Sequence, residues 1–340
     1  MAPRRLGSSG LAVAPIALGT MMFGAWGQPD PAACRRMVHR ALDAGITLFD
    51  TADIYDFGRS EEILGDALRG RRDRVVLATK CGNPMDGDPL HRGLSARWIR
   101  SSCEASLRRL GVEHIDLYQM HRPDPSVPLA ETLGAFDDLV SAGKIGAVGT
   151  STFPAPLLDE LQSVAAASGL AAPTVEQPPY SILARGIETS VLPACRRHDL
   201  GVLVWAPLNG GWLTGKYQQT SASDDETSRA NRQGEHFDHR DSAVRRRKLA
   251  LVDRLSVVAT DCGLTLVQLA LAFVLDDPAV SAAVDRPADA PAARRPARRR
   301  RAGAAVGRSF GDRRDRRPRR ERQPRRRDLT RDVVLRSPGS

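Results

Sequence analysis

Four side chains capable of acid–base chemistry lie at or just beyond the ends of apolar runs. Asp50 ends the run Ile46-Thr-Leu-Phe49, and Tyr55 stands in the polar loop that follows. Lys80 ends the run that begins at Val75, and His121 ends the run that begins at Ile115. Short runs of this composition predict buried strands. Because the carboxyl ends of parallel strands share one edge of a sheet or barrel, we expect the four groups to meet there.

This set of groups suits the reduction of a carbonyl. A free tyrosine has a pKa of about 10, which makes it a slow proton donor near neutrality. A nearby ammonium, that of Lys80, would stabilise the phenolate of Tyr55, and Asp50 would hold the ammonium in place. His121 could orient the carbonyl oxygen and hydrogen-bond to it. A lysine or histidine at a strand end can also simply reach water, so the argument rests on the four residues together.

Strand-like and helix-like segments alternate along the chain, which predicts a parallel sheet covered by helices. A small hairpin is expected over Arg5–Val13, and Ser60 is expected to cap a helix. The predicted strands are 16–20, 47–51, 74–80, 115–121, 147–152, 174–177, 202–208 and one starting at Pro278. The predicted helices are 30–44, 60–69, 95–110, 129–142, 155–167, 188–197 and 265–275, with a long loop over 209–245. Eight strands without a composition break favour a closed (β/α)8 TIM barrel, and the absence of G-x-G-x-x-G argues against an open dinucleotide-binding sheet.

Several short motifs give the chain from about Arg5 to Leu275 a resemblance to the aldo-keto reductases. They are Leu18-Gly-Thr-Met-Met-Phe-Gly24, Phe49-Asp-Thr-Ala-Asp-Ile-Tyr55, Thr79-Lys80, Asp116-Leu-Tyr-Gln-Met-His121, Gly149-Thr-Ser-Thr152, Val175-Glu-Gln177, Trp205-Ala-Pro-Leu208 and Leu213-Thr-Gly-Lys216. The resemblance implies a (β/α)8 barrel that uses NADPH (NADP), with Tyr55 as proton donor tuned by Lys80 and Asp50. It also implies that His121 places a small carbonyl substrate. Gln119-Met-His121 followed by Arg122-Pro-Asp-Pro125 is most similar to the branch with bacterial general stress reductases and potassium-channel β subunits.

The same resemblance implies which residues bind the cofactor. Ser151 and Gln177 would hold the nicotinamide carboxamide, with Trp205 stacked on the ring, although a large aromatic residue can also serve packing alone. Thr152 stands where the family usually has asparagine, so we expect a weaker contact to the carboxamide there. The remaining residues expected along the cofactor are Gly19, Thr20, Asp50, Leu208, Gly215 and Lys216.

Composition narrows the class of protein further. The chain has 340 residues, of which 41% are hydrophobic, and no run of about 18 apolar residues that would predict a membrane span. The N-terminus lacks the continuous apolar segment of a signal peptide. Five scattered cysteines without a C-x-x-C pair favour reduced thiols in the cytoplasm over disulfides or a metal site. The sequence leaves open whether the protein is a monomer or a homo-oligomer.

Residues 285–340 differ from everything before them. They contain twenty arginines, no lysine and seven acidic residues, so the whole-chain charge of +10 lies in this tail and residues 1–284 carry about −3. A disordered solvated tail is the simplest interpretation. A nucleic-acid-binding arm is a second, weakened by the single aromatic residue, Phe310.

Translation out of frame is the third interpretation, and we favour it. If the arginines have CGN codons, the frame one base later permits Ile-Gly-Pro-Arg-Thr at 285–289. It also permits Ile-Asp-Glu-Ile at 312–315. Aldo-keto reductases have a Gly-x-Arg-Thr turn that holds the adenosine phosphate, followed by a helix, at these places. We therefore expect a barrel over 1–284 with an incomplete eighth strand, no final helix and weak cofactor binding.

Three functions remain open at this point. The first is an NADPH-dependent carbonyl reductase, impaired by its altered C-terminus. The second is a cofactor-binding regulatory subunit on the same barrel, and the third is nucleic-acid binding through the tail. The substrate is not readable, because specificity would lie in the loops 22–30, 83–94 and 209–245.

Overall fold

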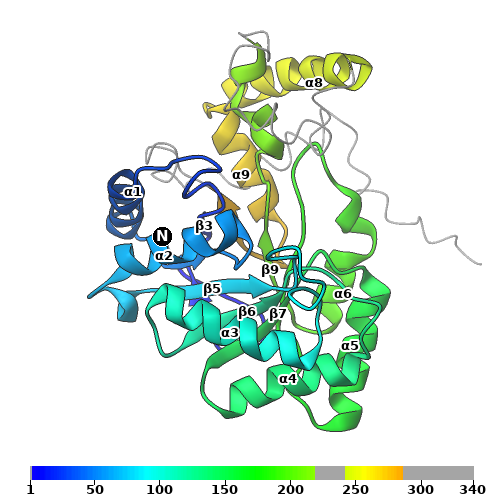
Figure 1. Cartoon of the computed structure of the whole chain (residues 1–340). Coiled ribbons are helices and arrows are strands. Elements are labelled where there is room, and N and C mark those ends of the chain that lie inside the picture. The colour runs from blue at the N-terminus through cyan, green and yellow to red at the C-terminus, as the bar shows by residue number, and fades with distance from the viewer. Residues whose placement is uncertain (1, 219–241, 286–340) are drawn as a thin grey trace, which may run out of the picture.

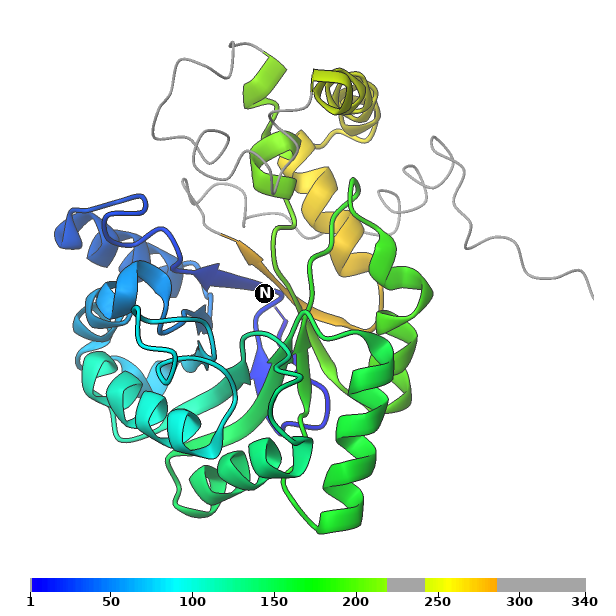
Figure 2. The same ribbon diagram turned by 45° about the vertical axis from the view of Figure 1, so that its right-hand side comes forward.

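Eight parallel strands form a closed barrel ringed by helices (Figure 1; Figure 2). In this computed structural model the described residues are 2–218 and 242–285. Around the barrel the strands follow the order β10, β3, β4, β5, β6, β7, β8, β9, so each neighbour in sequence is also a neighbour in space. The predicted (β/α)8 TIM barrel is therefore confirmed.

The barrel strands are short, and all pair in parallel. They are β3 (Ile16–Gly19), β4 (Leu48–Asp50), β5 (Val76–Cys81), β6 (Ile115–Met120), β7 (Ile145–Ser151), β8 (Val175–Gln177), β9 (Gly201–Val204) and β10 (Val280–Asp285). The eighth strand, β10, pairs with β9 on one side and with β3 on the other. The expected incomplete eighth strand is thus wrong, because residues 280–285 pair with both neighbours and close the barrel. The expected final helix and the arginine-rich tail lie outside the described residues.

Helices cover the outside of the barrel. They are α1 (Pro31–Asp43), α2 (Arg59–Leu68), α3 (Ala96–Leu110), α4 (Leu129–Ser141), α5 (Ala155–Ser168), α6 (Val191–Arg197), α8 (Ser242–Asp261) and α9 (Leu266–Asp276). Short 3-10 turns are η1 (Tyr55–Gly58), η2 (Arg72–Arg74), η3 (Gly186–Thr189), η4 (Asn209–Thr214) and η5 (Lys216–Gln218). The helix α9 packs on β10, whereas α8 packs on α9 and η4 and stands at the margin of the barrel (Figure 1).

Local sequence explains where several helices begin and end. Asp30 caps α1 by accepting from the backbone N–H groups of Ala32 and Ala33, with Pro31 at the first helical position. Thr265 and Gln268 form a capping box at the start of α9. The prediction for Ser60 is wrong: α2 begins at Arg59 after Gly58, whose φ is 94°. The Ser60 hydroxyl instead donates to the carbonyl of Thr20 at 2.8 Å inside the barrel wall.

Three element boundaries also differ from the sequence prediction. The strand expected over 202–208 ends at Val204, because Ala206 has a φ of 54° that breaks the strand. The helix expected from Glu188 is a 3-10 turn followed by α6 from Val191. The loop expected over 209–245 contains η4, η5 and the start of α8, and residues 219–241 lie outside the described part. The N-terminal hairpin is confirmed as β1 (Arg4–Arg5) and β2 (Ala12–Val13).

The core has two apolar layers, and the inner one prepares the site. Small and aliphatic side chains from all eight strands fill the barrel interior: Ala17, Leu48, Ala78, Leu117, Ala147, Val175, Leu203, Ala282 and Val284. Leu6 and Val13 of the hairpin plug this ring from below. Side chains on a strand alternate between faces, so the residues two positions further on also point inward. Those residues include Asp50, Lys80, Gln119, Gln177 and Trp205. They form a largely polar layer at the carboxyl end of the barrel strands, which we call the mouth.

Candidate active site

A buried ion pair forms the centre of the polar layer. Lys80 Nζ donates to Asp50 Oδ2 at 2.7 Å and to the backbone carbonyl of Thr51 at 2.7 Å. The Lys80 side chain is 1% exposed. Burial lowers the pKa of the Lys80 ammonium, but Asp50 and the phenol of Tyr55 outweigh it, so the pKa lies above its ordinary value. Lys80 is therefore a permanent cation held beneath the mouth.

Tyr55 stands directly above this cation, as the sequence predicts. The Lys80 Nζ atom is 5.3 Å from the centre of the Tyr55 ring, and Tyr55 raises the pKa of Lys80 through a hydrogen bond and through the charge of its phenolate form. Tyr55 begins η1, in which Asp56 and Phe57 have φ of 47° and 52°. Left-handed backbone at two consecutive non-glycine residues is costly, and such strain is typical of functional loops. This loop conformation places the phenol of Tyr55 near the carboxyl end of β4.

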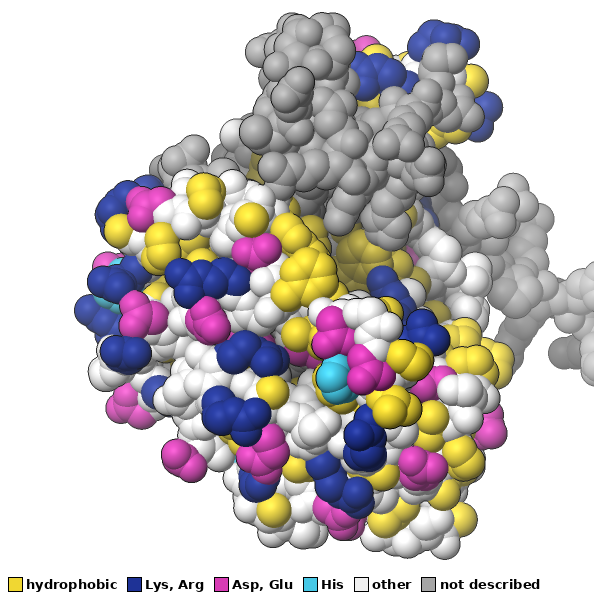
Figure 3. All heavy atoms as spheres, viewed as in Figure 1, with side chains coloured by type: hydrophobic (Ala, Val, Ile, Leu, Met, Phe, Trp, Pro, Cys, Tyr) yellow, Lys and Arg dark blue, Asp and Glu magenta, His cyan; other side chains and the backbone are white. Residues whose placement is uncertain are grey.

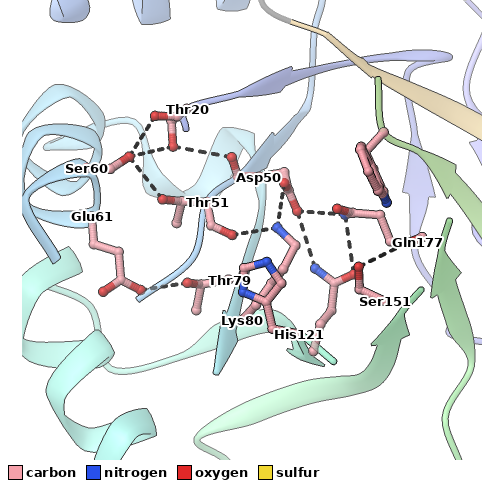
Figure 4. Close-up of polar contacts among 12 residues, drawn as sticks. Thr20, Asp50, Thr51, Ser60, Glu61, Thr79, Lys80, His121, Ser151 and Gln177 are labelled. Atoms are coloured by element: carbon pink, nitrogen blue, oxygen red, sulfur yellow. Dashed lines mark hydrogen bonds and ion pairs between the residues drawn. The ribbon is translucent and has the colours of Figure 1, made fainter. Parts of the chain in front are cut away.

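His121 completes the predicted group of four. Its ring packs edge-on against the Tyr55 ring, with centroids 5.8 Å apart (Figure 4 shows His121 in front of Lys80). Burial, with added repulsion from Lys80 and Arg122, holds the pKa of His121 well below its usual range. The imidazole is thus neutral at physiological pH and can donate one hydrogen bond without carrying charge. Its Nδ1 atom is buried and has no partner among the described residues.

Amide side chains surround the other side of Asp50. Gln177 Nε2 donates to Asp50 Oδ1 at 2.9 Å, and Gln119 Nε2 reaches the same oxygen at 3.3 Å. Ser151 Oγ donates to the backbone carbonyl of Gln177 at 3.0 Å. Figure 4 shows the side chains of Lys80, Asp50 and Gln177 turned towards one another from separate strands. Gln119 was not among the predicted site residues, although its position two residues before His121 places it on the same inward face.

Side chains that follow β7 and β9 meet at Thr152, the residue directly after Ser151. Trp205 Nε1 donates to Thr152 Oγ1 at 3.3 Å, and Arg122 Nη1 donates to the same oxygen. The φ of Thr152 is 60°, an unfavourable value for a β-branched residue. The predicted residues Ser151, Thr152, Gln177 and Trp205 are therefore gathered on one side of the mouth.

The remaining predicted residues lie at the rim or in the wall. Gly19 ends β3, where an added Cβ would come within 2.9 Å of Val284. Thr20 is fully buried, and its hydroxyl shares a 2.9 Å hydrogen bond with Ser60. Leu208, Gly215 and Lys216 lie in the segment after β9, next to or within η4 and η5. In the space-filling view, hydrophobic side chains gather around a hollow on this face of the molecule (Figure 3).

A second buried polar network supports the loop that carries Tyr55. Arg109 of α3 pairs with Glu61 of α2 at 2.7 Å, and Thr79 of β5 donates to Glu61 at 2.6 Å. Ser102 donates to Asp53 at 2.9 Å. Burial, reinforced by the charge of Glu61, raises the pKa of Asp53 to about 7. Sequence reasoning missed this network because its partners come from elements that lie up to 49 positions apart.

Three further features of the described residues concern the cysteines, metal ligands and membrane-spanning helices. The five cysteines, all within the described residues, form no disulfide there, and four of them are buried. Across residues 2–218 and 242–285, no cluster of three or more His, Cys, Asp or Glu side chains could hold a metal ion. Within the same ranges no helix alone has the length and apolarity to cross a membrane; α8 and α9 pass only as a pair, bent by 88°.

Comparison with known proteins identifies the family. The model of the Aldo/keto reductase family matches residues 15–286, which is most of the chain. The chain belongs to this family. The match ends where the described barrel ends, one residue after β10, so the comparison and the closed fold agree on the extent of this aldo/keto reductase barrel.

Curated relatives are similar over nearly their full length. The aldo-keto reductase YhdN of Bacillus subtilis is 35% identical over 288 residues, covering 82% of each chain. The uncharacterized oxidoreductase YrpG of the same organism is 38% identical over 293 residues, covering 83% of this chain and 86% of the relative. A probable voltage-gated potassium channel subunit beta of Arabidopsis thaliana is 35% identical over 294 residues, covering 83% of this chain and 85% of the relative. This aldo/keto reductase is therefore an oxidoreductase barrel of the carbonyl-reducing type.

Proposed function

We propose that the protein reduces an aldehyde or ketone to an alcohol with NADPH, and that Tyr55 donates the proton. The observation that carries this proposal is the buried Lys80–Asp50 pair beneath the Tyr55 ring. A buried cation next to a phenol favours the phenolate that remains after proton donation. Asp50 keeps the ammonium directed at the site, so no rearrangement is needed at the moment of reaction.

His121 would place the substrate. Because its imidazole is neutral, it can donate a hydrogen bond to the carbonyl oxygen without competing with Tyr55 as an acid. The edge-on contact between the two rings keeps both groups on the same side of the mouth. The carbonyl oxygen would then receive two donors, one from the phenol and one from the imidazole.

The residues present fit a nicotinamide dinucleotide, whose reduced ring supplies the hydride when bound. Ser151 and Gln177 offer neutral hydrogen-bonding groups next to the half-buried Trp205. Beyond them, η4 contains Gly210 and Gly211 with φ of 66° and 95°, a backbone conformation that glycine adopts without strain. The cation of Lys216 lies 4.9 Å from the Tyr217 ring beside this turn. A glycine-bearing turn with a lysine suits a pyrophosphate.

Substitution of Tyr55 by Phe tests the proton donor. We expect NADPH oxidation with 4-nitrobenzaldehyde, followed by absorbance, to fall by about 100-fold or more, the scale of a lost general acid. Binding of NADPH, measured by fluorescence, should change by less than about twofold, because the phenyl ring keeps its packing. Equal turnover by the Tyr55→Phe variant and the parent protein would contradict the proposal.

A second function is supported by the similarity to proteins named as potassium channel β subunits. In that case the barrel would bind the cofactor as part of a regulatory subunit. The same experiment separates the two functions. Cofactor binding without turnover of any aldehyde would favour the regulatory subunit.

A further inference from the structure

We propose that the guanidinium of Arg122, held in place by its hydrogen bond to the Thr152 hydroxyl, binds an anionic group of the carbonyl substrate. The preferred substrates would then be aldehydes or ketones that carry a carboxylate. This inference rests on the proposed reductase function and names the substrate class for the same site.

The charges around the mouth leave Arg122 as an available cation. Lys80 is neutralised by Asp50 at 2.7 Å, and His121 is kept neutral by burial. Within residues 2–218 and 242–285, Arg122 makes no ion pair, and it is exposed to solvent. The carboxyl group that feels its charge, that of Glu176, is fully buried. Glu176 is already engaged by the Thr150 hydroxyl and by the backbone N–H of Phe153.

The contacts of Arg122 direct its guanidinium across the mouth. Its Nη1 atom donates to Thr152 Oγ1 at the end of β7 and, at 3.4 Å, to the backbone carbonyl of His121. Thr152 Oγ1 also accepts from Trp205 Nε1. One guanidinium nitrogen is therefore anchored, which leaves other N–H groups in the fork geometry that matches a carboxylate.

The position of Arg122 relative to the acid–base residues suits a small molecule. Arg122 directly follows His121, the residue expected to hold the carbonyl oxygen, so their Cα atoms are about 3.8 Å apart. A substrate bound at Tyr55 and His121 would extend towards the Arg122 guanidinium, and Thr152 and Trp205 would stay available to the nicotinamide. The aromatic rings of Trp26 and Tyr55, with centroids 6.4 Å apart, offer an apolar wall for the part between the two polar ends.

An alternative role for Arg122 is purely structural. Its bond to Thr152 could simply hold a strained residue whose φ is 60°. A structural role predicts equal losses for charged and neutral substrates together with lower stability. A binding role predicts a loss confined to substrates with an anionic group.

The experiment compares matched aldehydes in the full-length protein. Steady-state kinetics with NADPH would use 2-, 3- and 4-carboxybenzaldehyde and the corresponding nitrobenzaldehydes, which have a similar shape without the charge. For at least one carboxylate isomer, Arg122→Gln should lower kcat/KM by about 10- to 100-fold. This is the change expected when a hydrogen bond to a charged group is lost. The nitrobenzaldehydes should change by less than about twofold. Arg122→Lys, which keeps the charge but loses the fork, should give an intermediate loss.

Two controls keep the outcome decisive. Arg100→Gln removes an arginine on the outer face of α3 that pairs with Asp138 of α4. This control should leave kcat/KM unchanged for both substrate series. Equal losses for the carboxy and nitro series in Arg122→Gln, or no loss in either, would overturn the inference while the reductase function stands. If no aldehyde is reduced, the proposed function itself fails. Carboxybenzaldehyde binding, followed by tryptophan fluorescence, then decides: equal affinity in the parent protein and Arg122→Gln overturns the inference.

Discussion

At the scale of single residues, the site depends on which charges are neutralised and which are not. Lys80 stays charged because Asp50 and Tyr55 raise the pKa of its ammonium, although burial lowers it. His121 stays neutral because it is buried beside two cations. The same inward layer thus contains a fixed cation and a neutral donor, and the difference arises from the partner each residue has.

The raised pKa of Asp53 leads to a prediction about how the stability of the protein depends on pH. Its pKa is about 7 in the folded protein and 3.8 as an ordinary carboxyl, so the folded state binds its proton more tightly. The free energy of unfolding should therefore fall as pH rises from about 4 to about 7 and level off above that. Asp53→Asn removes this contribution while keeping a group that can bond to Ser102. The variant should gain stability relative to the parent by up to about 4 kcal/mol between pH 4 and pH 8.

Urea unfolding of both proteins at several pH values checks this. Other groups, including the buried Glu176, contribute the same slope to both proteins, so the difference between the two curves isolates Asp53. Parallel curves over the whole pH range would show that Asp53 is not protonated in the folded state.

At the scale of elements, the helices α2 and α3 are joined by a buried ion pair that supports the Tyr55 loop. The Glu61 side chain is 0% exposed and Arg109 is 20% exposed. Gly65 of α2 allows this close approach, because a Cβ there would come within 2.2 Å of the Leu110 carbonyl oxygen. The pair therefore holds α2 against the end of α3 and, through Thr79, against β5.

Removing one partner of this pair should be costly. In Arg109→Met, Glu61 would remain buried without its cation, which typically costs about 3–5 kcal/mol. Arg108→Met is the matched control: the same substitution one residue away, at an exposed position of α3, should cost less than about 0.5 kcal/mol. Chemical denaturation measures both variants. Equal stabilities would mean that the ion pair contributes nothing beyond its surroundings.

At the scale of the whole molecule, the barrel is closed although the sequence changes character just after it. The strand β10 pairs with both neighbours up to Asp285, and the family match ends at residue 286. The segment expected to grip the adenosine phosphate lies beyond this point. The abrupt end of the family match supports the proposal that the arginine-rich tail is translated out of frame, which the coding DNA around codons 278–290 would test.

At the scale of the whole molecule we predict that NADPH binds weakly. With the phosphate grip altered, we expect NADPH at micromolar concentration to raise the Tm only slightly, because stabilisation depends on the ratio of ligand concentration to Kd. Thermal unfolding with and without NADPH measures this. A large Tm increase at micromolar NADPH would show that the barrel up to Asp285 binds the cofactor without the missing turn.

Much of the fold and the central group of the site could be predicted from the sequence. Alternating apolar strands and amphipathic helices determine the barrel, and Asp50, Lys80 and His121 stand at strand ends that parallel pairing brings to one face. Period-two alternation also places Gln119 on the inward face of its strand. These features are local, or follow from the simple geometry of parallel strands.

Other features were decided only by the tertiary structure. The bond from Ser60 to the Thr20 carbonyl in place of a helix cap, the pairing of Arg109 with Glu61, and the availability of Arg122 depend on groups that meet from distant elements. Closure by β10 depends on strands nearly 270 residues apart in sequence, since Ala283 pairs with Ile16. Charge state follows from burial and partners, which no linear pattern contains. The sequence determined where the chemistry lies, and the packing of the barrel decided which groups are charged, neutral or free to bind.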